Sequence, residues 1–178
     1  IIKCNKEKYS IKLFYFLPDD ANTKKINKIK ELINFECEIK IKKDPEFFPP
    51  LNCVFNGRPP NVVMDNQSTG GLKGWLYQLD GIEKSYEMVK QYEINNNMTF
   101  DYIARIRHDV LFLQNVDFSL LDQEKINIPD FHKWFGINDR FAFGKSDIMS
   151  VYMKMFSNLY KDCSNNKLII RSAEWYCK

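Results

Sequence analysis

Residues Phe100 to Asp109 have the sequence FDYIARIRHD. Residues 100–107 are rich in β-forming side chains and predict a strand. Because side chains alternate between the two faces of a strand, we expect Arg105, Arg107 and Asp109 on one face. Such a group could bind a phosphate and a divalent cation together, since guanidinium suits phosphate oxygens and carboxylate suits Mg²⁺ or Mn²⁺. The alternative is a structural Arg–Asp ion pair at a sheet edge, which spacing alone favours because such pairs are common.

Strands alternate with helices on both sides of this stretch, which indicates an α/β domain with a mostly parallel sheet. Residues 72–94 carry apolar side chains at steps of three and four and predict the longest helix. Residues 44–70 are rich in proline and show no period, which is typical of a binding loop or of disorder. The other expected strands are 10–17, 37–42, 126–129, 141–144 and 167–170, a further short apolar run is 110–113, and the other expected helices are 21–35, 147–160 (with Ser146 as its cap) and one from Ser172.

Composition limits the possible functions. The chain has 178 residues and a formal net charge of +3, which fits one globular domain and argues against a general nucleic-acid binder. No apolar run approaches the roughly 20 residues of a membrane-spanning helix. The five cysteines form no C-x-x-C pair, so we expect reduced thiols in a cytoplasmic protein, without a zinc ribbon.

A second polar motif, Asn138-Asp139-Arg140, follows Trp134 and leads into the aromatic strand at 141–144. Aromatic rings can stack on a sugar while carboxylates accept hydrogen bonds from its hydroxyls. Asp139 is therefore a candidate general base for an acceptor hydroxyl. The alternative is an Asx-turn that only starts the strand.

Three further features of the sequence are weaker candidates. His108 and His132 lack the spacing of a zinc hydrolase, so a lone structural role is favoured for His132. Glu174 lies in the first turn of an expected helix, where a carboxylate complements the helix dipole. The Gly70-Gly71-Leu72-Lys73 turn leads into a helix and could present N–H groups to an anion.

The order of these motifs resembles GT-A-type, nucleotide-sugar-dependent glycosyltransferases of large algal viruses, algae and bacteria with sugar-coated surfaces. The resemblance runs from about Gly71 to the C-terminus. The segments that carry it are WLYQ (75–78), FDYIARIRHD (100–109), INIPD (126–130) and GINDRFAFG (136–144), with DIM (147–149) and Tyr152. It implies a single GT-A-like, Rossmann-like domain over residues 1–178, flanked by helices, with a strand–helix unit expected upstream of Ile1 or missing.

The resemblance also assigns roles to residues. Asp109 would be the carboxylate that binds Mn²⁺ or Mg²⁺. The usual Asp-x-Asp motif of the family is reduced here to His108-Asp109. Asp139 and Glu174 would be the catalytic carboxylates. The nucleotide side would be held by Lys73, Gln78, Arg105 and Arg107.

The expected reaction is transfer of a sugar from a nucleotide-sugar donor to a glycan hydroxyl, in the cytoplasm (of the host cell if the protein is viral). A cation and basic side chains would stabilise the departing diphosphate, and a carboxylate would take the acceptor proton if configuration is inverted. A non-catalytic carbohydrate- or nucleotide-binding module of the same fold is the first alternative. A nucleic-acid-binding domain that uses the early lysines is the least favoured.

Overall fold

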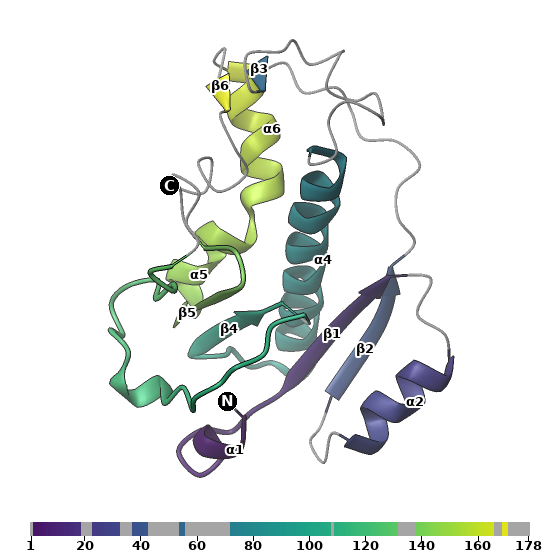
Figure 1. Ribbon diagram of the computed structural model, residues 1–178, viewed down its shortest axis with the longest axis vertical. Coiled ribbons are helices and arrows are strands. Elements are labelled where there is room, and N and C mark those ends of the chain that lie inside the picture. The colour runs from purple at the N-terminus through teal and green to yellow at the C-terminus, as the bar shows by residue number, and fades with distance from the viewer. Residues whose placement is uncertain are drawn as a thin grey trace.

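The computed structural model describes residues 2–18, 23–32, 37–42, 54–55, 72–107, 109–131, 138–165 and 169–170. These residues form a mixed α/β domain with short sheets (Figure 1). In chain order the elements are α1 (Ile2–Asn5), β1 (Leu13–Pro18), α2 (Thr23–Leu32), β2 (Cys37–Lys42), β3 (Val54–Phe55), α4 (Leu72–Asn96), β4 (Tyr102–Ile106), the 3-10 helix η1 (Phe118–Leu120), β5 (Phe141–Lys145), α5 (Ser146–Met153), α6 (Met155–Asn165) and β6 (Ile169–Ile170).

Helix α4 is the centre of the domain, and the helix predicted at 72–94 is confirmed. Figure 1 shows α5 and α6 on one side of α4 and the β1–β2 pair on the other, and α4 contacts both groups. The helix ends at Asn96, and Asn97 takes a left-handed backbone with φ of 49°. This conformation is a common helix stop, because it turns the chain while the last carbonyls still accept hydrogen bonds. Tyr92 of the predicted apolar stripe is only partly buried, and the side chain of Leu72 is outside the description. The other six residues of the stripe are buried: Trp75, Leu76, Leu79, Ile82, Tyr86 and Val89.

The strands form three two-stranded pairs within the described residues. Strands β1 and β2 pair in parallel from Leu13↔Cys37 to Pro18↔Lys42, and β3 and β6 also pair in parallel. Strands β4 and β5 pair antiparallel, with Arg105 opposite Ala142. The expectation of an α/β domain is thus confirmed. Each sheet formed by the described residues has two strands, whereas one mostly parallel sheet was expected.

The chain between β4 and β5 contains less regular structure than predicted. The apolar run at 110–113 is not a strand, and residues 126–129 contribute only an isolated bridge between Asn127 and Phe143. The loop is instead held by side chains. Asn5, which is fully buried, donates to the Val116 carbonyl at 2.7 Å and accepts from the Phe118 N–H at 2.9 Å. Phe118 in turn stacks on Phe143, with 4.4 Å between ring centroids.

The prediction of a Ser146-capped helix at 147–160 is wrong in two respects. Ser146 is already the first residue of α5, and its N–H donates to the Asp101 carbonyl at 2.9 Å. No side-chain hydrogen bond caps this helix. The helix is also interrupted at Lys154, so that α5 and α6 are separate elements. Glu83 of α4 binds both the N–H and the hydroxyl of Ser157, which fastens the start of α6 to the central helix.

The main core lies between α4, α5 and α6, and a smaller aromatic core lies under the loop that precedes β5. In the smaller core Phe141 and Phe143 are 5% and 1% exposed. These two rings were expected to be available to a sugar, and their burial against Phe118 and Phe112 excludes that role.

Some expectations fall on residues outside the described ranges: most of 44–70, the helix from Ser172, and two of the cysteines. Cys4, Cys37 and Cys163 form no disulfide with one another in the part of the chain that the structure describes. None of the described helices combines the length and the apolar character needed to cross a membrane.

Candidate functional site

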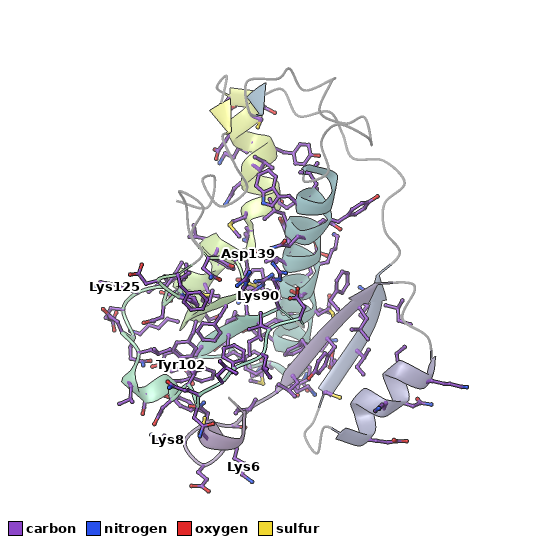
Figure 2. All side chains as sticks on the ribbon, in the orientation of Figure 1. Lys6, Lys8, Lys90, Tyr102, Lys125 and Asp139 are labelled. Carbon is purple, nitrogen blue, oxygen red and sulfur yellow. The ribbon has the colours of Figure 1, made fainter. Side chains whose placement is uncertain are left out.

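Arg107, directly after β4, joins two carboxylates that lie far apart in the sequence. Its Nε and Nη2 atoms donate to the two oxygens of Asp109, at 2.8 and 2.5 Å. Its Nη1 atom donates to Oδ2 of Asp139 at 2.9 Å. Asp139 also accepts a hydrogen bond from the Gln78 amide on α4. Asp139 is labelled in Figure 2, where it lies at the middle of the molecule beside α4. We call Gln78, Arg105, Arg107, Asp109 and Asp139 the arginine–carboxylate cluster.

Backbone pairing brings Arg107 to Asp139. The Arg107 N–H donates to the Arg140 carbonyl at 3.0 Å, which continues the pairing of β4 with β5 by one step. Asn138 fixes the turn before β5: its Oδ1 accepts from the Arg140 N–H and its Nδ2 donates to the Phe131 carbonyl, both at 2.8 Å. The Asx-turn considered for this motif is therefore made by Asn138. Asp139 remains available to face Arg107 and Gln78.

Arg105 is the buried member of the cluster, at 9% exposure. Burial alternates along β4, so that Ile103 and Arg105 lie on its buried face, and Arg107 continues that face. The predicted alternation thus holds for Arg105 and is continued by Arg107, whereas Asp109, the third residue expected on this face, lies in a turn beyond the strand. The Nη1 atom of Arg105 has no hydrogen-bond partner within the described ranges. Burial lowers the pKa of this guanidinium, and the nearby Tyr152 and Asp139 oppose that shift.

The charges of the cluster stabilise each other. Burial by itself disfavours the charged form of Asp139, but the hydrogen bond from Gln78 and the positive charge of Arg107 outweigh it and lower the pKa of Asp139 below 3.8. The hydrogen bond to Asp109 raises the pKa of Arg107. Asp139 is therefore ionised at neutral pH, and both arginines carry their charge, as guanidinium does throughout the physiological range.

One oxygen of the Asp139 carboxylate, Oδ1, accepts no hydrogen bond from the described residues. Both hydrogen bonds that Asp139 accepts fall on Oδ2, so Oδ1 has no hydrogen-bond donor among the described residues. The Asp139 side chain is 24% exposed. An ionised, partly accessible carboxylate oxygen can accept a proton or a hydroxyl hydrogen bond.

The described residues do not fit the divalent-cation site that was predicted at Asp109. Both oxygens of Asp109 are occupied by the Arg107 guanidinium. No group of three His, Cys, Asp or Glu side chains in the described part of the chain could hold a metal ion. Mn²⁺ and Mg²⁺ need several oxygen ligands. The side chain that contacts Asp109 here is instead the Arg107 guanidinium, which is positively charged and offers N–H groups.

Five of the predicted site residues thus meet in one place: Gln78, Arg105, Arg107, Asp109 and Asp139. Lys73 lies in the first turn of α4, but its side chain is outside the description. Glu174, His108 and His132 also lie outside the described residues. The Asx-turn alternative anticipated a structural role for the 138–140 motif, but it did not anticipate the second contact of Asn138, with the Phe131 carbonyl.

A groove elsewhere on the surface is a competing site. It has a volume of about 460 Å³ and lies between β2 and the second half of α4. Acidic, basic and amide side chains are mixed in its lining, and no predicted site residue contributes to it. The lining residues are Glu38, Ile39, Lys40, Glu87, Met88, Gln91, Tyr92 and Asn95. This mixture of charges favours no particular ligand.

Comparison with known proteins gives one family match. Residues 5–168 match the family described as "Domain of unknown function (DUF7796)". The chain belongs to this family. The matched range of DUF7796 contains the whole arginine–carboxylate cluster and Lys73, whereas Glu174 lies beyond it. No curated protein and no solved structure matches the chain.

Proposed function

We propose that this DUF7796 protein is a nucleotide-sugar-dependent glycosyltransferase whose active site is the arginine–carboxylate cluster. The observation that carries the proposal is the bridge from Arg107 to both Asp109 and Asp139, next to the buried Arg105. Two guanidinium groups suit the diphosphate of a donor, and two carboxylates suit the hydroxyl groups of sugars. These are the two chemical parts of a nucleotide sugar.

In the proposed reaction Arg105 and Arg107 stabilise the diphosphate as it leaves, which is where negative charge develops. Asp139 accepts the proton of the attacking acceptor hydroxyl through Oδ1, in an inverting transfer. Gln78 and Arg107 hold the other oxygen and thereby fix the direction of the carboxylate. No step of this mechanism uses a metal ion, because the described donor set does not fit one.

The fold proposed with this function is of the GT-A type. The parallel β1–β2 pair, the long central helix and the strand β4, which is directly followed by Arg107, support it. In α/β folds of this kind, ligands bind beyond the carboxyl ends of strands. Arg107 and Asp109 occupy that position at the end of β4. The proposed setting is the cytoplasm, where nucleotide sugars would be the donors and glycans the acceptors.

A donor screen with the Asp139→Asn variant tests the proposal. Nucleotide-sugar turnover is measured with sugar acceptors and with water, and donor affinity is measured by calorimetry. We expect the variant to lose about 100-fold or more in turnover, because it lacks the proton acceptor, while donor affinity changes little. The matched control is Asp147→Asn, which alters an exposed carboxylate in the first turn of α5. Unchanged turnover in Asp139→Asn would remove Asp139 from the mechanism.

A non-catalytic carbohydrate- or nucleotide-binding module is the second candidate. It is favoured by the paired state of the cluster, in which one arginine binds both carboxylates. The same screen separates the two functions. Saturable donor binding without turnover on any acceptor supports the binding module and contradicts the transferase.

A further inference from the structure

The contact between Arg107 and Asp109 has the geometry of a bound phosphate. One edge of the guanidinium, formed by Nε and Nη2, donates two parallel hydrogen bonds to the two oxygens of a single carboxylate. This planar fork binds two oxygens of a phosphate group in the same manner. Asp109 therefore occupies the edge of Arg107 that a phosphate ligand would need.

Asp109 is also placed so that it can leave this edge. Its side chain is 49% exposed, and it lies in the loop directly after β4 rather than in a strand. An ion pair with this exposure contributes little to stability, because water solvates the carboxylate almost as well. The Arg107–Asp109 pair therefore gives up little stability when a ligand oxyanion takes the place of Asp109.

Arg105 supplies an independent reason to expect an anion. Its side chain is buried, and its Nη1 atom finds no acceptor in the described part of the chain. A buried donor without an acceptor destabilises the folded protein, so such atoms are rare unless a ligand or water satisfies them. With Asp109 displaced, two guanidiniums would face only one carboxylate of the cluster, Asp139, and the site would attract an anion.

We infer that Asp109 is an internal substitute for a ligand phosphate, and that Arg105 and Arg107 bind a diphosphate group directly once Asp109 is displaced, without a divalent cation. The inference rests on the proposed function only for the identity of the group as the diphosphate of a nucleotide sugar. It assigns to the two arginines the charge neutralisation that a metal ion would otherwise provide.

The Asp109→Asn variant separates this inference from a metal-binding role, because the two predict opposite effects. If Asp109 competes with the ligand, its neutral variant binds the ligand more tightly. If Asp109 holds a metal ion that holds the ligand, the variant binds the ligand more weakly or not at all. The carboxylate is half-exposed, so the substitution leaves the fold intact.

The experiment is calorimetric titration of the full chain with inorganic pyrophosphate in the presence of EDTA. We expect saturable binding by the wild type, and an affinity about two- to fivefold higher in Asp109→Asn, the size of a half-exposed ion pair. The matched control is Asp122→Asn, since Asp122 has a similar exposure of 45% and pairs with Lys125 at 2.9 Å, away from the cluster. Its affinity should equal that of the wild type.

Two results would overturn the inference: pyrophosphate binding that requires added Mn²⁺ or Mg²⁺, or loss of binding in Asp109→Asn. A second variant, Arg107→Lys, keeps the positive charge but removes the two-nitrogen edge. We expect it to lose about tenfold or more in affinity, as for other two-pronged guanidinium contacts. Unchanged affinity in this variant would also overturn the inference, provided that its thermal melt is that of a folded protein.

Failure of the inference and failure of the proposed function give different results. Metal-free pyrophosphate binding with no turnover of any nucleotide sugar leaves the inference intact and contradicts the transferase. Turnover that depends on added Mn²⁺ and is lost in Asp109→Asn supports the transferase and contradicts the inference.

Discussion

Replacement of Asn138 by alanine tests how the candidate site is held in place. Asn138 is 1% exposed, and its carboxamide joins two backbone groups on either side of the turn before β5. It donates to the Phe131 carbonyl and accepts from the Arg140 N–H, each at 2.8 Å. The variant removes both hydrogen bonds and leaves a small void in a buried position.

The expected loss in the free energy of unfolding follows from these contacts. Two hydrogen bonds at a net value of about 1 kcal/mol each amount to about 2 kcal/mol. The Arg140 N–H is left without its acceptor, which adds up to about 1 kcal/mol. Phe131 is 57% exposed, so water can reach its neighbourhood and limit the cost at its carbonyl. We therefore expect a loss of about 2–3 kcal/mol.

Urea unfolding followed by far-ultraviolet circular dichroism measures this difference. The matched control is Asn115→Ala, at an exposed position in the same loop region, for which we expect a change within about 0.5 kcal/mol. If the free energy of unfolding of Asn138→Ala is within about 0.5 kcal/mol of the wild-type value, Asn138 does not hold the turn. The explanation given for the position of Asp139 is then refuted.

Two further predictions concern pH and packing. The folded-state pKa of Asp139 lies below its ordinary value of 3.8, so its ion pair contributes fully to stability above that pH and loses its contribution as pH falls through the folded pKa. The stability difference between the wild type and Asp139→Asn, measured by urea unfolding, should thus shrink from about pH 5 to about pH 3, and a difference that stays constant would contradict this assignment. A Cβ at Gly144 would lie 3.0 Å from the Lys125 carbonyl oxygen and 3.4 Å from Cγ of Met149. We expect Gly144→Ala to lower stability by about 1–3 kcal/mol, and an unchanged melting temperature would show that the loop at Lys125 yields freely.

Local sequence patterns predicted most of the elements. The apolar runs at β1 and β4 and the period of α4 are properties of short segments, and these elements lie within a few residues of their expected ends. Pairing between strands depends on distant segments, so the antiparallel pairing of β4 with β5 did not follow from the alternation of strands and helices. For the same reason residues 126–129, which have a strand-like composition, form only the bridge from Asn127 to Phe143.

The sequence predicted which residues form the candidate site, but it did not predict most of the contacts between them. The alternation of residues in β4 correctly placed Arg105 and Arg107 on one face. The contact of Gln78 with Asp139 joins residues 61 positions apart and depends on the tertiary packing that brings α4 to the turn before β5. The ion pair of Asp109 with Arg107 is the alternative that the residue spacing favoured. It occupies both carboxylate oxygens that the predicted cation site would use.

The most direct test of the account is a calorimetric titration of the wild type and of Arg107→Lys with the diphosphates of uridine, guanosine, cytidine and adenosine, without metal ions. We expect saturable binding of at least one nucleotide to the wild type and a large loss of that binding in the variant. Equal affinity of the two proteins, or the failure of every nucleotide to bind, would contradict it.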